Sequence, residues 1–213
     1  MSYNYHEAAV NAVCFYEHGR KFVSTSDDRK MLCWDYGYNP PTRYIQETYM
    51  SSMPALKLHP SGDYILCSAL NNQIAVYKCM DTVVHHPRKR FNGHKVGGFA
   101  LQPTCSPDGE FVGCGDCEGN LWFWSWKTCK VLNKMPGHVG AVACVDWHPV
   151  ESSYVASSGW DGVIKLWDLC VCFKYSNSST NNLQNRHTID RYLPIADADG
   201  LPSTVDDIFF AVS

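Results

Sequence analysis

The sequence predicts an all-β protein built from four copies of one strand-rich unit. The main observation is a repeat that closes on an aromatic residue at positions 34, 77, 124 and 167, so that the steps are 43, 47 and 43 residues. In addition, short apolar runs alternate with turn-forming Pro, Gly, Asp and Ser. A period of roughly 40–45 residues is typical of four-stranded β-propeller blades. We therefore expect blades that stack on one another and do not fold singly.

The fourth copy shows the order of strands and turns most clearly. Gly137-His138 precedes an apolar strand expected at 141–147, and further strands are expected at 154–158 and 163–167. Gly159-Trp160-Asp161-Gly162 forms the turn between the last two strands, because glycine accepts the positive φ that such turns need. The first and third copies follow the same order, and the second lacks the Gly-His pair.

The copies predict unit boundaries at about 1–38, 39–80, 81–128 and 129–168, followed by a tail at 169–213. The tail contains a polar run rich in Ser and Asn at 176–182, a composition that buries too little apolar surface to pack. We expect the tail to be mostly disordered, with a short apolar end, Ile208-Phe209-Phe210, that could dock.

Propellers close with typically 4–8 blades, and those built from units of this period usually carry seven, so four blades are fewer than expected. Three arrangements are open: a fragment of a longer protein, a ring completed by another chain, and a distorted partial arc. An open arc exposes an apolar blade face, which favours aggregation. We expect a partial ring that belongs to a seven-bladed propeller, because the first copy starts within a few residues of Met1.

Composition and charge exclude several classes of function. The net charge is −3, and Lys and Arg are scattered, whereas charge-driven binding to nucleic acid needs clustered cations. No apolar run approaches the ~20 residues of a membrane span, and the N-terminus has no signal-peptide pattern. We expect a cytosolic or nuclear protein that binds neither a membrane nor a small-molecule substrate.

Eleven cysteines raise the question of disulfides or a metal site. The single C-x-x-C, Cys114–Cys117, has no second pair at zinc-binding distance. Other cysteines lie inside apolar strands, where a free thiol behaves as a small hydrophobe; these are Cys14, Cys33, Cys67 and Cys144. We predict reduced core thiols, no metal and no cofactor.

Polar residues recur at fixed offsets before the closing aromatic. Aspartate stands six residues before it and serine ten, and a histidine precedes each set; the two complete sets are His6, Ser24, Asp28, Trp34 and His138, Ser157, Asp161, Trp167. They resemble the hydrogen-bond chain of WD40 repeats, in which Asp binds His, His binds Ser, and Ser binds the indole N–H. His, Ser and Asp also suggest a hydrolase triad, but the set repeats in a structural register and has no oxyanion-hole loop. We predict a structural network and no catalytic residue.

The second and third copies depart from this pattern. The third has Cys114 and Glu118 where Ser and Asp are expected, so its His94 has neither partner; the second has Cys67 and Asn71. We expect packing to stabilise these two blades more than polar contacts do. Pro103 also lies within the expected inner strand of the third copy, residues 99–105, and proline removes a ladder donor. That strand should be short or bulged.

Candidate partner contacts lie in the turns and in one linker. Asp27 and Trp160 each directly precede a turn aspartate, and an exposed Trp suits a binding anchor, although packing against the neighbouring blade is an equal alternative. The only basic cluster is Arg88-Lys89-Arg90. Solvation in a loop is the simple interpretation of this cluster, and contact with RNA or an acidic partner is the sharper one.

Several less generic residues resemble one family of WD40 proteins, pre-mRNA-processing factor 17. These are residues 22–28, Ser52-Met53-Pro54-Ala55, Asn72-Gln73-Ile74, residues 91–98, Trp124-Ser125-Trp126-Lys127-Thr128, and residues 147–162. The resemblance covers about residues 6–168 and corresponds to the last four of the family's seven blades. The N-terminal region of the family has no counterpart here, and the tail from Leu169 is foreign to it.

This resemblance implies a nuclear, non-catalytic scaffold of the spliceosome that supports the second step of pre-mRNA splicing. Its partners would be spliceosomal proteins, with indirect or loop-mediated RNA contact. The alternative is a generic WD40 adaptor, such as a ubiquitin-ligase substrate receptor or a signalling scaffold. An enzyme is the alternative of a different class. It would be favoured if replacing His6 or His138 by alanine abolished a measurable turnover and left the melting temperature unchanged.

Overall fold

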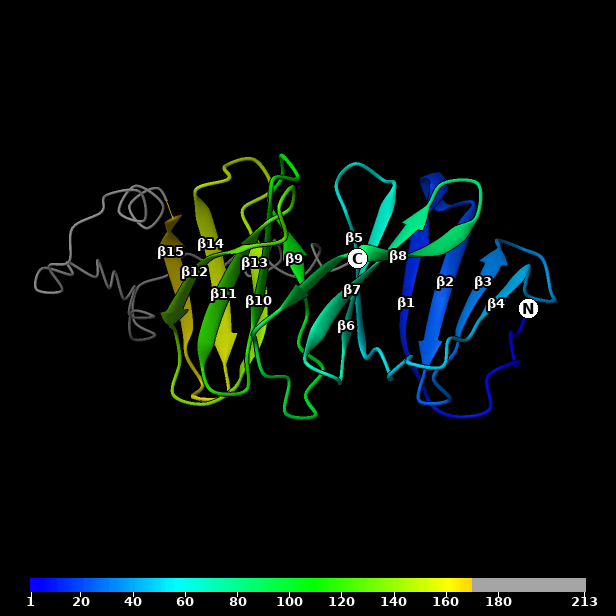
Figure 1. Cartoon of the computed structure of the whole chain (residues 1–213), viewed down its shortest axis with the longest axis horizontal. Helices are drawn as coiled ribbons and strands as arrows, with labels where there is room; N and C mark the ends of the chain where they lie inside the picture. Colours follow the sequence, from blue (N-terminus) through cyan, green and yellow to red (C-terminus); the bar gives the residue numbers. More distant parts are fainter. Residues whose placement is uncertain (170–213) are drawn as a thin grey trace, which may run out of the picture. The chain divides into compact units, whose positions relative to one another are not determined.

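A computed structural model of the chain describes residues 1–169 and consists of antiparallel β-sheets (Figure 1). The expectations for the tail, including the polar run at 176–182 and the apolar end at 208–210, lie outside the described residues. Each sheet is a meander in which strands pair in the order of the chain. The prediction of an all-β protein made of four propeller blades is confirmed.

The first blade contains β1 (Val10–Tyr16), β2 (Lys21–Ser26), β3 (Met31–Asp35) and β4 (Arg43–Ile45), with a 3-10 turn, η1 (Glu17–Gly19), between β1 and β2. The second contains β5 (Ala55–Leu58), β6 (Tyr64–Ala69), β7 (Gln73–Cys79) and β8 (Val83–Asn92). The third contains β9 (Thr104–Cys105), β10 (Phe111–Gly115), β11 (Asn120–Ser125) and β12 (Val131–Pro136). The fourth contains β13 (Val142–Trp147), β14 (Tyr154–Gly159) and β15 (Ile164–Asp168).

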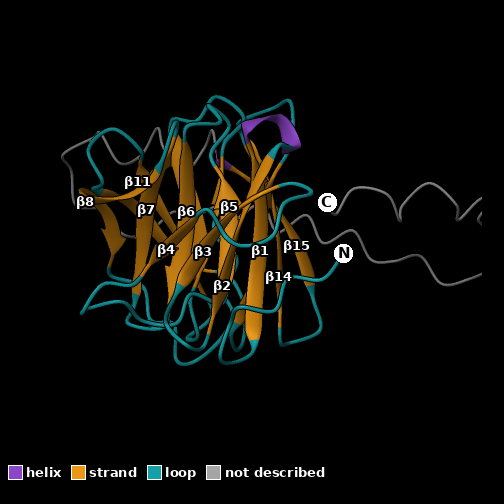
Figure 2. Ribbon diagram, turned by 90° about the vertical axis from the view of Figure 1, so that its right-hand side faces the viewer, coloured by secondary structure: helices purple, strands orange, loops and turns teal. Residues whose placement is uncertain are grey.

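The outer strand of each complete blade follows the closing aromatic after a linker. The first sheet therefore extends to Ile45, beyond the end of the first sequence unit at about residue 38. The four sheets lie face to face in a row, with the first and fourth blades at its two ends (Figure 1). Figure 2, which looks at the row from the first blade, shows the connecting loops gathered at both ends of the strands.

The core consists of apolar layers between successive sheets. Alternate residues of a strand face opposite sides of its sheet, so one strand can supply two layers. In the second blade, Ile65 and Tyr77 pack toward the first blade, whereas Leu66 and Val76 pack toward the third. Each fully buried side chain of this size stabilises the fold by roughly 1.5–3 kcal/mol.

The layer between the third and fourth blades shows which faces meet. Leu121 and Phe123 of β11 pack against Val142, Val145 and Trp147 of β13. All five side chains are buried. The strand that carries the closing aromatic of one blade thus packs on the inner strand of the next.

The inner strand of the third blade is only two residues long, as Pro103 predicted. The backbone N–H of Phe99 donates to the carbonyl of Val96, and that of Leu101 donates to the carbonyl of Phe99. These turn contacts replace ladder pairing before Thr104. The prediction of a short strand is confirmed.

The cysteine prediction is correct in part. The nine cysteines of the described range are free thiols, and Cys33 and Cys67 are buried in the core. Cys14 is half-buried, but Cys144 is exposed, so the prediction that it lies in the core is wrong. A register shift between Val142 and Cys144 changes which residues of β13 alternate inward, so that Val142 and Val145 are buried and Cys144 is exposed.

Among residues 1–169, no helix has the length and apolar character needed to cross a membrane.

Candidate functional site

The first blade contains a continuous hydrogen-bond network across a loop and two strands. His6 lies before β1 and its Nδ1 is 2.9 Å from Asp28 Oδ2, while its Nε2 is 2.8 Å from Ser24 Oγ on β2. Trp34 Nε1 on β3 donates to the same hydroxyl at 2.9 Å. The offsets of six and ten residues from Trp34 thus select side chains that meet in space.

The fourth blade repeats this network with nearly the same geometry. His138 Nδ1 lies 2.9 Å from Asp161 Oδ1, and its Nε2 lies 2.8 Å from Ser157 Oγ. Trp167 Nε1 donates to Ser157 Oγ at 2.8 Å. The two networks therefore stabilise the first and last blades in the same way.

The hydrogen-bonding capacities of the four side chains determine where the protons of each network lie. The indole N–H donates to the serine oxygen, so the serine O–H is free to donate to histidine Nε2, and histidine Nδ1–H donates to the aspartate. A neutral histidine satisfies every group in this chain. The network joins a loop to two strands. Hydrogen bonds in such a chain polarise and strengthen one another.

Both aspartates also bind the backbone at the start of their turns. Asp161 accepts from the N–H groups of Val139 and Val163. The Val139 bond, together with those from His138 and Val163, lowers the pKa of Asp161 to about 2. Burial alone would raise the pKa of Asp28, but hydrogen bonds from His6, Glu7 and Lys30 together hold it below its usual range. Both carboxylates stay ionised as anchors of the loops.

The networks do not present a nucleophile. Ser24 and Ser157 are buried, and each hydroxyl already binds an imidazole and an indole. A substrate carbonyl would have to displace the tryptophan to reach either oxygen. These groups therefore hold strands together and have no open position for chemistry.

The third blade lacks the network. His94 is buried and neither of its ring nitrogens has a hydrogen-bond partner in the described structure. Glu118 forms an ion pair with Lys95, and Trp124 Nε1 donates to the carbonyl of Asn92 at 3.1 Å. Burial lowers the pKa of His94 to about 4.

A different buried carboxylate organises this turn, and the sequence reasoning missed it. Asp116 accepts the indole N–H of Trp122 at 2.7 Å, and it also binds the backbone N–H groups of Glu118 and Asn120. Asp116 stands six residues before Trp122, the same offset as in the complete networks. The offset of six residues is therefore visible in the sequence, but it leads from Asp116 to Trp122 and not to the closing aromatic, Trp124.

On the loop face of the first blade, Asp27 joins two blades. Its Oδ1 accepts from Asn11 Nδ2 at 2.7 Å and from Ser52 Oγ at 2.7 Å. Ser52 belongs to the segment that leads into the second blade. The bonds from Ser52 and Asn11 lower the pKa of Asp27, so this carboxylate is ionised at neutral pH.

Trp160 lies on the same loop face, in the turn between β14 and β15, and is 69% exposed. It contacts Phe99 of the third blade edge-on, with ring centroids 4.7 Å apart. Val139 beside it is also exposed. Trp160 therefore packs on a neighbouring blade and still presents most of its surface to solvent.

The basic cluster lies on β8, the outer strand of the second blade, and its members differ. Arg88 and Arg90 are exposed, whereas Lys89 is half-buried. Lys89 Nζ lies 3.9 Å from the ring centroid of Trp126 and donates to its carbonyl at 2.7 Å. The Lys89 ammonium is thus engaged in a contact between the second and third blades.

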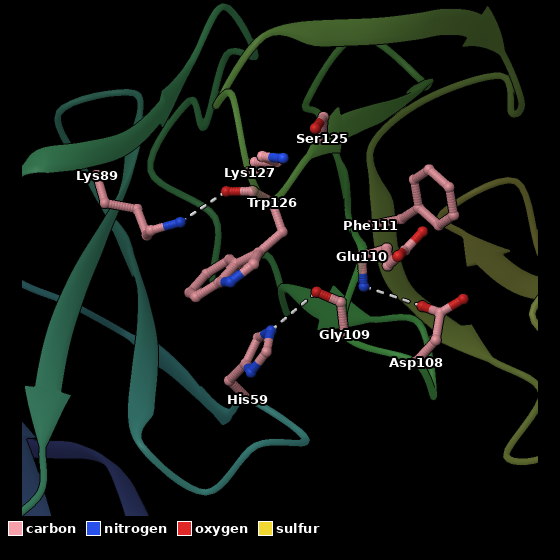
Figure 3. Close-up of a pocket in the computed structure, with 9 residues that line it drawn as sticks. All are labelled: His59, Lys89, Asp108, Gly109, Glu110, Phe111, Ser125, Trp126 and Lys127. Atoms are coloured by element: carbon pink, nitrogen blue, oxygen red, sulfur yellow. Dashed lines mark hydrogen bonds between the residues drawn. The ribbon is translucent and has the colours of Figure 1, made fainter.

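Lys89 and Trp126 line a pocket of about 630 Å³ (Figure 3). His59 stacks on Trp126 at 4.0 Å, on the opposite side of the ring from Lys89 in this view, and its Nε2 bonds to the carbonyl of Gly109 at 3.1 Å. Burial lowers the pKa of both His59 and Lys89. Because both faces of the indole are covered, we interpret this pocket as a blade junction.

No group of three or more His, Cys, Asp or Glu side chains in residues 1–169 is placed to hold a metal ion.

The repeat, the blades and the two networks define a WD40-repeat β-propeller protein. A family model described as WD domain, G-beta repeat matches residues 1–35 and 129–168, the stretches that contain the two complete networks. The chain is 41% identical to pre-mRNA-processing factor 17 of Homo sapiens over 172 residues. The aligned stretch covers 79% of this chain and 29% of that protein. The chain is 34% identical over 170 residues to the Saccharomyces cerevisiae protein of that name, covering 79% of this chain and 37% of the relative.

The chain is thus a WD40-repeat protein related to pre-mRNA-processing factor 17. WD repeat-containing protein 25 of Mus musculus is a more distant relative, 29% identical over 164 residues. The chain spans 29–37% of the length of these three relatives.

Proposed function

We propose that this chain is a non-catalytic scaffold of the spliceosome that acts in the nucleus and supports the second step of pre-mRNA splicing. The observation that carries the proposal is the 41% identity to human pre-mRNA-processing factor 17 over 79% of the chain. A blade array offers loops and sheet faces for docking, which suits the assembly of other components. Its partners would be spliceosomal proteins.

The loop face around Trp160 is the proposed contact surface. An exposed tryptophan with a rigid aromatic neighbour is the kind of anchor that contributes most to protein interfaces. Phe99 fixes one edge of the Trp160 ring at 4.7 Å and leaves the rest of it open. Asp27, with an ionised carboxylate on the same face, would contact a donor group of the partner.

The exposed guanidinium groups of Arg88 and Arg90 form a second proposed contact, with RNA phosphate or an acidic segment. Arginine suits phosphate because its planar fork donates two parallel hydrogen bonds. The Lys89 ammonium would add little, since it already binds the Trp126 carbonyl. Replacing both arginines by glutamine should weaken RNA co-purification and reduce its salt dependence.

Affinity purification of the full chain from its own cells tests the proposed function. We expect spliceosomal small nuclear RNAs and their proteins in the eluate, and a marked loss of both with Trp160→Ala. Val150→Ala is a matched control, because Val150 is an exposed apolar residue in the loop that joins β13 and β14, at the other end of the strands. Recovery of cullin-ligase subunits without small nuclear RNAs would instead favour a ubiquitin-ligase adaptor.

A further inference from the structure

The outer strand of the second blade contains a wide bulge at the basic cluster. In the ladder between β7 and β8, Tyr77 pairs with His85 and Ala75 pairs with Arg90. A single residue of β7 therefore faces residues 86–89 of β8. Because four residues cannot span the length of one within a ladder, this part of β8 leaves the plane of the sheet. Bulges of this kind redirect side chains next to functional sites.

Contacts at both ends hold the β8 bulge, residues 86–89, in one shape. The backbone N–H of Lys89 donates to His86 Nδ1 at 3.1 Å and closes the bulge on itself. The His86 ring lies against Tyr64, with ring centroids 6.4 Å apart. The Lys89 ammonium binds the carbonyl of Trp126 at 2.7 Å and lies over its ring. The bulge is thus anchored to the junction between the second and third blades.

The two residues between these anchors, Pro87 and Arg88, are exposed. The proline ring fixes its own φ, so the backbone that leads to Arg88 has little freedom. Arg88 therefore extends from a rigid support. Such support reduces the conformational entropy that a side chain loses when it binds a partner.

The contact between Lys89 and Trp126 brings a further cation to the basic cluster. Lys127 follows Trp126 directly, is exposed, and lines the same pocket as Lys89 (Figure 3). Within residues 1–169, Arg88, Arg90 and Lys127 take part in no ion pair. The fold thus gathers three available cations that the sequence places in two separate segments.

The acidic side of the pocket lies away from the bulge. Asp108 is on the opposite side of the pocket from Lys89 (Figure 3). Its Oδ1 accepts from the Ser106 hydroxyl and from the backbone N–H of Glu110, so this carboxylate is bound within its own loop. The side of the pocket that β8 forms is therefore the cationic one.

From this arrangement we propose that the β8 bulge binds the phosphodiester backbone of single-stranded RNA. Arg88, Arg90 and Lys127 contact phosphates, and Lys89 is a positioning residue that holds Arg88 in place. The available cations are spread along one strand and onto the next blade, which suits an evenly charged chain better than a single phosphate group. The inference rests on the proposed spliceosomal function, which supplies the RNA.

Fluorescence anisotropy with a short labelled oligouridine tests the site on the full chain, between about 50 and 200 mM salt. Each phosphate contact to a single strand contributes about −0.7 to the slope of log affinity against log salt. Three contacts predict a loss of affinity of about 20-fold over this range, and Arg88→Gln should reduce the loss to about sevenfold. Arg20→Gln, which replaces an exposed arginine of the first blade, should leave the salt dependence unchanged.

Lys89→Met separates positioning from direct contact. Methionine keeps an apolar side chain on Trp126 and removes the ammonium that anchors the bulge. We expect the same fall in salt dependence as in Arg88→Gln, and no further fall when the two substitutions are combined. A further fall in the double variant would overturn the positioning role, because Lys89 would then contact the RNA itself. Thermal melting checks the fold of Lys89→Met, whereas Arg88→Gln changes an exposed side chain only.

The outcomes distinguish this site from the proposed function. Wild-type salt dependence in Arg88→Gln, or tighter binding of a polyglutamate peptide than of oligouridine, would overturn the RNA site. If spliceosomal small nuclear RNAs still co-purified with the chain in that case, the proposed function would stand without this site. The expected oligouridine binding without any spliceosomal component in the purification would support the site and overturn the function.

Discussion

The imidazole of His94 packs edge-on against the indole of Trp124 with ring centroids 5.4 Å apart, and both imidazole nitrogens lack a hydrogen-bond partner in the described structure. The equivalent histidines, His6 and His138, each bind an aspartate and a serine. The third blade thus keeps the histidine but lacks the aspartate and the serine that bind it in the two complete networks. An unpaired buried polar group destabilises a fold, so this position should respond to substitution and to pH.

Stability should fall at mildly acidic pH because of His94. Its pKa in the fold is about 4, below the ordinary 6.5, so between these values the unfolded chain binds more protons than the folded chain. Keeping His94 unprotonated in the fold therefore costs no stability above about pH 6.5, and costs increasingly more as the pH falls toward 4. We expect a loss of about 2–3 kcal/mol by pH 4, measured by urea unfolding across this range.

His94→Leu should remove most of this pH dependence. Leucine has a similar volume and no polar atoms, so stability at neutral pH should be unchanged or slightly higher. The lowered pKa of Asp28 and Asp161 acts in a different window, below their ordinary 3.8, and separates from the histidine effect. An unchanged slope between about pH 6.5 and pH 4 in His94→Leu would assign the effect to other groups.

Cys114→Ser should supply the missing hydrogen-bond partner of His94. Cys114 stands ten residues before Trp124, where the complete networks have Ser24 and Ser157. The free energy of unfolding is measured for Cys114→Ser with His94 present and in the His94→Leu background. We expect a favourable coupling of roughly 0.5–1.5 kcal/mol between the serine and the histidine. A coupling near zero would mean that the two side chains do not meet.

His138→Ala should destabilise the fold by roughly 1–3 kcal/mol, because it leaves the hydroxyl of Ser157 without its acceptor and removes a bond to Asp161. His6→Ala should have a similar effect in the first blade. Chemical unfolding measures both. His18→Asn is a suitable control, since His18 is exposed and its φ of 56° is one that asparagine tolerates; it should change stability by less than about 0.5 kcal/mol.

Fixed offsets made the blades and the polar networks predictable from the sequence. The closing aromatic, the turn aspartate and the strand serine recur at set distances in the chain, and each distance corresponds to a position in a regular hairpin. Pro103 likewise predicted the short β9, because a missing N–H has a local consequence.

Contacts between blades were harder to predict from the sequence, because they depend on which blade covers which face. Trp160 meets Phe99, a residue in a loop whose path no repeat specifies. Lys89 turns from the basic cluster onto Trp126 at a register shift in β8. Cys144 follows a register shift in β13, which the apolar sequence of that strand does not reveal and which breaks the alternation that would bury it.

Two glycines at the same repeat position should respond differently to substitution. Gly119 and Gly162 each stand five residues before the closing tryptophan, with φ of 88° and 75°. The second blade has Asn72 there, with φ of 64°, so the turn itself accepts asparagine. A Cβ on Gly162 would meet nothing within 4 Å, whereas one on Gly119 would lie 2.0 Å from the carbonyl oxygen of His138.

Gly162→Asn should therefore cost less than about 1 kcal/mol, the effect of the backbone conformation alone. Gly119→Asn should cost at least about 2 kcal/mol more, because the carbonyl of Gly119 also accepts the N–H groups of Gly137 and His138 and the two backbones cannot separate without losing these bonds. Chemical unfolding of both variants measures the difference. Equal losses would show that the turn of the third blade and the loop of the fourth are not held in close contact in solution.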